Sequence, residues 1–138
     1  MNFYKELELI LKASQPQNKI KMFRKFFEDF KNDALKMSKT YEAKFFEEPS
    51  YSEVCTVVPP QDVPKRSSLT QKDGQINLIH AIAHIEYSAI DLALDGAYRF
   101  VNMPRKYYLD WLEVANDEIQ HFLMLEEILH SLGASYGD

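Results

Sequence analysis

The sequence predicts an all-α protein, and three observations support that fold class. Apolar residues recur at three- and four-residue spacing over long segments, which is typical of helices with one buried face. Four of the six prolines lie between residues 47 and 74, so the segments on either side are almost free of helix breakers. The 138 residues are 46% hydrophobic, so a chain of this length can bury the core of one domain.

The chain is expected to have three parts. Residues 1–46 read as N-terminal helices, residues 47–74 as a proline-rich connector, and residues 75–138 as an antiparallel helical hairpin. The first N-terminal helix should cover 2–13, and Ser14 followed by Pro16 indicates the start of the second. The second carries an apolar stripe at Ile20, Phe23, Phe27, Phe30, Ala34, Met37, Tyr41 and Phe45, and is therefore predicted to continue to about residue 45.

The hairpin is predicted from stop and start signals between two long amphipathic segments. The first helix should run over 75–100 and the second over 104–132. Gly96 and Pro104 bracket the break, with the turn near Asn102. Gly133 is a plausible cap for the end of the second helix.

Glu118 and His121 form the most informative pair in the chain. Residues three apart on a helix project from the same side, and this pair lies on the face expected to be buried. A buried carboxylate is costly unless a partner charge or a metal ion compensates it. The pair therefore suggests metal ligation, although a Glu-x-x-His spacing is common by chance and the two side chains could simply hydrogen-bond each other in the core.

Glu86, in the preceding helix, strengthens the metal interpretation. It lies 16 residues before Asn102, and Glu118 lies 16 residues after it. At about 1.5 Å per residue, both carboxylates lie about 24 Å from the turn and so at the same height. One carboxylate helix beside one Glu-x-x-His helix is half of the di-metal site of a ferritin-like bundle. The alternative is that Glu86 pairs with an arginine such as Arg99.

The donor set of Glu86, Glu118 and His121 favours iron, with manganese as the alternative metal. His80 and His84 are also spaced to share a metal, but they point about 120–160° away from Glu86 around the helix. They are expected to pack or hydrogen-bond against the N-terminal helices instead.

Several segments of the second half carry a family resemblance. They are the run from His80 through Glu86, Asp91 and Asp95 to Tyr98-Arg99-Phe100, then Asp110-Trp111-Leu112, Val114 to Glu118, His121-Phe122 and Tyr136-Gly137-Asp138. Together they resemble an uncharacterised bacterial ferritin-like family that is distantly similar to the non-haem di-iron tRNA hydroxylases. The resemblance implies a ferritin-like bundle in which Glu86, Glu118 and His121 are metal ligands. It also implies an oxygen-activating oxidase or hydroxylase.

The resemblance further implies that this chain holds only the first hairpin of the bundle. The family continues past the Tyr136-Gly137-Asp138 motif into a second hairpin with the remaining ligands. That second hairpin is expected from a C-terminal continuation of the chain, from a homodimer partner or from a separate polypeptide. Until it docks, a face formed by Ile82, Ile90, Val114, Phe122 and Leu125 should be incompletely covered.

Charge and composition limit the possible partners, location and function of the protein. Residues 1–46 carry a net charge of +4 and residues 75–138 a net charge of −7, so the basic helices are expected to lie against the acidic hairpin. Nucleic acid is a weaker candidate partner, because the lysines alternate with acids and no RNA-binding motif occurs. No apolar run is long enough to span a membrane, and the lone Cys55 suits the cytoplasm. A metal-free helical interaction module is the competing function.

Overall fold

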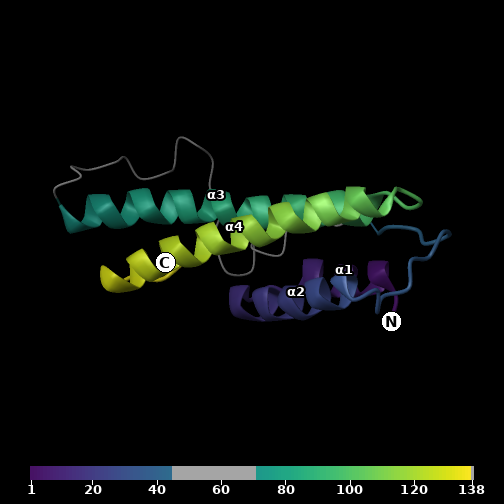
Figure 1. The fold of residues 1–138 in the computed structure, drawn as a ribbon. Helices are drawn as coiled ribbons and strands as arrows, with labels where there is room; N and C mark the ends of the chain where they lie inside the picture. Colours follow the sequence, from purple (N-terminus) through teal and green to yellow (C-terminus); the bar gives the residue numbers. More distant parts are fainter. Residues whose placement is uncertain (45–70, 138) are drawn as a thin grey trace.

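The computed structural model describes residues 1–44 and 71–137. Its helices are α1 (Phe3–Lys12), α2 (Pro16–Lys31), α3 (Lys72–Arg99) and α4 (Arg105–Ser131). No strand occurs within these described ranges, so the all-α prediction is confirmed at the level of fold class. Figure 1 shows α3 and α4 as a long antiparallel hairpin, with α1 and α2 lying along one side of it.

Most of the expected connector, together with Phe45, Cys55 and Asp138, falls outside the described part of the chain, whereas residues 72–74 of that connector belong to α3. The structure gives no description of 45–70 or of Asp138, and so none of Cys55. Helix α3 begins at Lys72, three residues before the predicted start at Gln75.

The starts of α1 and α2 are stabilised in different ways. The side chain of Asn2 accepts hydrogen bonds from the backbone N–H groups of Tyr4 and Lys5, which makes Asn2 the N-cap of α1. Helix α2 has Gln15 as its N-cap residue, without a side-chain cap, and Pro16 in its first turn. The predicted cap at Ser14 was therefore wrong by one residue, whereas the role of Pro16 was right.

Helix α2 ends at Lys31, so the prediction that it continues to about residue 45 was wrong. Asp33 adopts a left-handed conformation with φ of 56°. Its N–H group bonds to the carbonyl of Phe30, and the N–H of Ala34 bonds to the carbonyl of Asp29. These two bonds form a Schellman motif, which satisfies the last carbonyl groups of a helix and turns the chain away. Ala34, Met37 and Tyr41 are therefore not part of the helical stripe.

Gly96 has a packing role rather than the predicted role of a helix stop. It lies inside α3, and a Cβ atom at this position would be 2.8 Å from Cε2 of Trp111 on α4. The hydroxyl of Tyr107 donates a hydrogen bond of 2.6 Å to the carbonyl oxygen of Gly96. The absence of a side chain at this residue therefore lets α3 and α4 approach closely near the turn.

The predicted turn at Asn102 is confirmed. Asn102 has φ of 60°, a conformation that asparagine tolerates better than most residues. The Tyr108 hydroxyl donates to the carbonyl of Phe100 at 2.6 Å and accepts from the N–H of Met103 at 3.2 Å. It also lies 2.8 Å from the hydroxyl of Tyr4. One buried phenol on α4 therefore ties both sides of the turn to α1.

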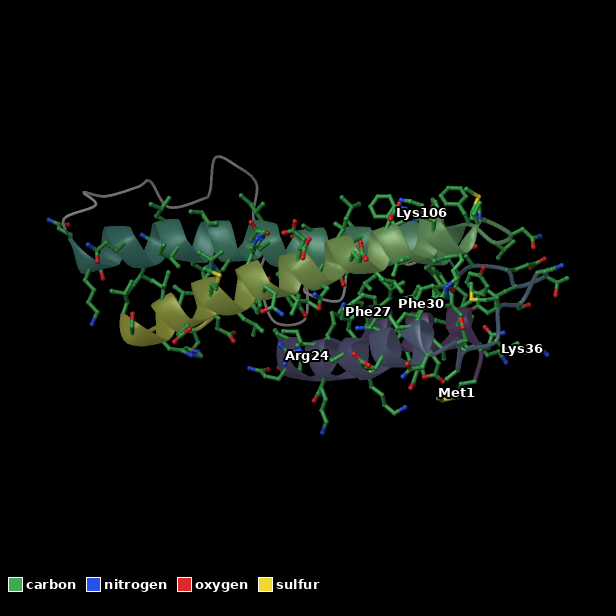
Figure 2. The ribbon with its side chains drawn as sticks, in the orientation of Figure 1. Met1, Arg24, Phe27, Phe30, Lys36 and Lys106 are labelled. Atoms are coloured by element: carbon green, nitrogen blue, oxygen red, sulfur yellow. The ribbon has the colours of Figure 1, made fainter. Side chains whose placement is uncertain are left out.

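The two N-terminal helices cover one face of the hairpin. Figure 2 shows Phe27 and Phe30 between α2 and the hairpin, and the ring of Phe3 packs against that of Tyr108 at 5.2 Å. Lys19 on α2 is fully buried and forms an ion pair with Asp91 on α3. Burial lowers the pKa of Lys19, and the charge of Asp91 opposes that shift. This pair supports the expectation that the basic helices lie against the acidic hairpin.

The Gly96→Ala variant should be less stable than the wild type. Alanine favours a helix by about 1 kcal/mol over glycine, but its Cβ would collide with the rigid indole of Trp111. We expect a net loss of about 1–3 kcal/mol, which is typical of overpacking. Thermal melts should show this loss, and combining Gly96→Ala with Trp111→Ala should remove the incremental penalty of the alanine. An unchanged or raised melting temperature for Gly96→Ala alone would contradict the close approach.

The Lys19–Asp91 pair should behave as a coupled buried unit. Asp91→Leu removes the carboxylate that pairs with the buried ammonium and should cost about 3–5 kcal/mol. The double variant Lys19→Met with Asp91→Leu should recover much of that loss, because no buried charge remains. Urea unfolding of the two single variants and the double variant gives the coupling energy. Additive effects would show that the two residues do not interact.

Candidate metal centre

Two helices bring Glu86, Glu118 and His121 together. Glu86 comes from the middle of α3, and the other two come from the middle of α4. One donor atom from each side chain lies within 4.8 Å of the others. The Nδ1 atom of His121 is 3.6 Å from Oε2 of Glu86 and 3.6 Å from Oε2 of Glu118. The predicted convergence of these side chains is therefore present, although metal binding by them stays a prediction.

These side chains are less buried than the sequence suggested. The side chains of Glu86 and Glu118 are 24% and 23% exposed, and that of His121 is 55% exposed. The reason is the position of α1 and α2. Asp91, which pairs with Lys19 of α2, lies about 140° around α3 from Glu86, at 3.6 residues per turn. The cluster therefore lies toward the side of the hairpin that the N-terminal helices leave open.

The donor chemistry of the cluster fits a divalent cation. Two donor atoms 3.6 Å apart can both lie about 2.1 Å from one ion, which is an ordinary metal–ligand distance. Two carboxylates and one imidazole suit iron or manganese. Within residues 1–44 and 71–137, the ion-pair contacts of both glutamates are with His121, whereas Arg99 pairs with Asp95 at 2.6 Å. The alternative of a Glu86–Arg99 pair is therefore not seen.

Both helices that carry the cluster also have exposed apolar side chains. On α3 these are Ile85 and Leu92, and on α4 they are Val114, Met124 and Ile128; each is at least 42% exposed. At about 100° per residue, Val114, Met124 and Ile128 lie within about 60° of His121 around α4, whereas Ile85 and Leu92 lie about 100–120° from Glu86 around α3. We call these five residues the apolar rim. Such a grouping is more than the scattered single exposures that are normal on a soluble surface.

The prediction of an incompletely covered face was only partly right. Val114 is 42% exposed, and Ile82 and Leu125 are half-buried. Ile90 and Phe122 are fully buried, so their assignment to that face was wrong. Both lie about 40° from the nearby glutamate toward the covered side, where Phe122 packs on Tyr87 with ring centroids 5.0 Å apart. Helix periodicity alone could not predict which edge of the hairpin's apolar face α1 and α2 would cover.

The contacts described for His80 and His84 lie on the C-terminal segment rather than the N-terminal helices. Nε2 of His80 accepts a hydrogen bond of 2.9 Å from the N–H of Gly137. Nδ1 of His84 lies 2.9 Å from the hydroxyl of Tyr136, whose ring stacks on both imidazoles. Burial lowers the pKa of His84. The sequence showed the spacing of the two histidines but not their partner, Tyr136. The chain turns at Gly133 and brings Tyr136 back to α3, and this tertiary contact cannot be predicted from local spacing.

The fold and the cluster define a helical protein whose hairpin presents two carboxylates and an imidazole on an open face. The chain belongs to the DUF455 family, described as a protein of unknown function, whose family model matches residues 12–138. It is 35% identical over 150 residues to an uncharacterised protein of Haemophilus influenzae. That match covers 99% of this chain and 50% of the relative, so the chain spans about half of the relative's length. No solved structure matches the chain. Every helix in the described residues is too short or too polar to cross a membrane.

Without metal, Glu118→Leu should stabilise the chain. Glu86 and Glu118 are partly buried like charges that converge on one histidine, so removal of one carboxylate relieves repulsion and desolvation. We expect a higher melting temperature in the presence of a chelator. Glu113→Leu, at an exposed position of the same helix, controls for the gain in helix propensity and hydrophobicity. A lower melting temperature for Glu118→Leu than for Glu113→Leu would show that Glu118 makes a favourable structural contact instead.

Proposed function

We propose that this chain is one half of a ferritin-like di-metal carboxylate protein and that Glu86, Glu118 and His121 are its ligands. The observation that carries the proposal is the convergence of their donor atoms within 4.8 Å from two different helices. A full site of this kind takes a carboxylate from each of two helices and Glu-x-x-His from each of two others. This hairpin supplies one of each.

Iron is the preferred metal and manganese the alternative, because both accept mixed carboxylate and imidazole ligands. Glu86 would reach the metal from α3, while Glu118 and His121 would hold it from α4. When bound, a pair of such ions would supply oxygen activation for an oxidase or hydroxylase reaction. The chain's own contribution would be to fix the spacing of the ligands on two packed helices.

A second helical hairpin would complete the centre and cover the apolar rim. The relative from Haemophilus influenzae is about twice as long as this chain, which supports a source in a continuation of the polypeptide. A homodimer about a two-fold axis would also supply two ligand sets, and a separate polypeptide is the third source. In each case the exposed side chains of Ile85, Leu92 and Met124 would become buried. The lone cysteine, Cys55, supports a cytoplasmic location for the assembly.

The second candidate is a metal-free helical interaction module. The apolar rim favours it, because an exposed apolar face can bind a partner helix without any metal. Under this proposal, Glu118 and His121 are polar neighbours at the edge of a docking surface. The two candidates differ in whether the chain retains metal and in whether metal changes its association.

Metal analysis of the 138-residue protein tests the proposal. We expect the wild type, after anaerobic exposure to Fe²⁺ or Mn²⁺ and desalting, to retain about one metal ion per chain, which is half of a two-metal site. Glu118→Ala or His121→Ala should cut metal content about tenfold or more. His130→Ala removes an exposed histidine of the same helix and should leave the metal content unchanged.

Equal metal content in the wild type and Glu118→Ala would contradict the metal proposal. Sedimentation in parallel distinguishes the two candidates. Association that requires metal supports the completed centre, whereas association that is lost in Leu92→Ser but is independent of metal supports the interaction module.

A further inference from the structure

The turn between α1 and α2 borders an open cleft that the proposed metal centre does not use. Its volume is about 730 Å³. Leu9, Ala13 and Met22 form its apolar floor, and Lys12, Lys21 and Lys25 lie around it. Leu9 is 52% exposed although it belongs to a helix that otherwise packs its leucines inward.

The charged residues that line the cleft are all lysines. Three lysines line it and no acidic residue does. Lys12 pairs with Glu8 and Lys25 with Asp29, each at 2.9 Å, and both acids lie outside the lining. Among the described residues Lys21 makes no ion pair, so its ammonium is free to meet an incoming carboxylate. The uncompensated charge of the cleft lining is therefore that of Lys21, and it favours an anionic ligand.

A smaller cavity adjoins the cleft. This cavity of about 100 Å³ shares Met22 and Lys25 with the cleft, and its other lining residues are Ile10, Phe26, Leu35, Glu6 and Asp29. An apolar side chain entering the cleft would meet aliphatic carbon on α1 and α2. A ligand that carries only charge would leave the apolar floor of the cleft wet, so the cleft suits a ligand with both carboxylates and aliphatic side chains.

We propose that the cleft between α1 and α2 is a docking site for an acidic amphipathic segment of another polypeptide. Its leucine-like side chains would cover Leu9 and Met22, and its carboxylates would pair with Lys12, Lys21 and Lys25. This is the helix-in-groove mode of peptide recognition. Nucleic acid fits less well, because the cleft lining contains no aromatic ring on which a base can stack. The proposal is independent of metal binding by the hairpin.

Fluorescence anisotropy with two labelled probes tests the proposal on the full 138-residue chain. The first probe is a 14-residue helical peptide with glutamates on one face and leucines on the other, and the second is a single-stranded oligouridylate of similar charge. We expect the peptide to bind to the wild type. Lys21→Glu should weaken the peptide's affinity about tenfold or more, because one electrostatic attraction becomes a repulsion. Leu9→Ser should weaken the peptide's affinity at least threefold. Lys36→Glu changes an exposed lysine at the other end of α1 and should have no such effect (Figure 2).

The possible results distinguish a peptide-docking site from a nucleic-acid site and from no site. Circular dichroism of each variant controls for folding, and both substituted side chains are exposed. Peptide binding that Lys21→Glu and Leu9→Ser both weaken, with little binding of the oligouridylate, supports the docking site. Absence of peptide binding, equal binding by wild type and Lys21→Glu, or a preference for the oligouridylate would overturn it. None of these results depends on whether the hairpin binds metal.

Discussion

The register of the α3–α4 hairpin is the constraint on which the rest of the structure depends. Asn102 sets the turn, and the Tyr108 hydroxyl holds the backbone on both sides of it. Gly96 then lets Trp111 bring the two helices into close contact. Because helices are stiff rods with a fixed rise, this register carries along their length and sets Glu86 opposite Glu118.

The two faces of the hairpin differ in how their charged side chains are compensated. On the covered face, Lys19 is fully buried and is compensated by Asp91, so the pair joins α2 to α3. On the open face, Glu86 and Glu118 converge on one histidine that is half-exposed. Two partly buried carboxylates beside a single imidazole leave negative charge that a cation can neutralise. The same two helices therefore carry a structural ion pair on one side and a candidate metal centre on the other.

The sequence was most informative where local rules act over long distances. The positions of Glu86 and Glu118 followed from counting residues to a turn, since helical rise is constant. Prediction failed where tertiary contacts decide: the stripe after Phe30 kept a helical period, yet the left-handed Asp33 ends α2. The burial of Ile90 and Phe122 depends on which edge α1 and α2 cover, and no periodicity encodes that. The return of Tyr136 to His84 likewise arises only in three dimensions.

The central claim is that one divalent ion is held jointly by α3 and α4, and paramagnetic broadening by Mn²⁺ tests it directly. Amide signals of ¹⁵N-labelled protein would be followed at substoichiometric Mn²⁺. The account predicts selective loss of signals around Glu86 on α3 together with those around Glu118 and His121 on α4, and its absence in Glu118→Ala. Broadening confined to one helix, or centred on the exposed acids near Asp110 and Glu113, would contradict a shared site.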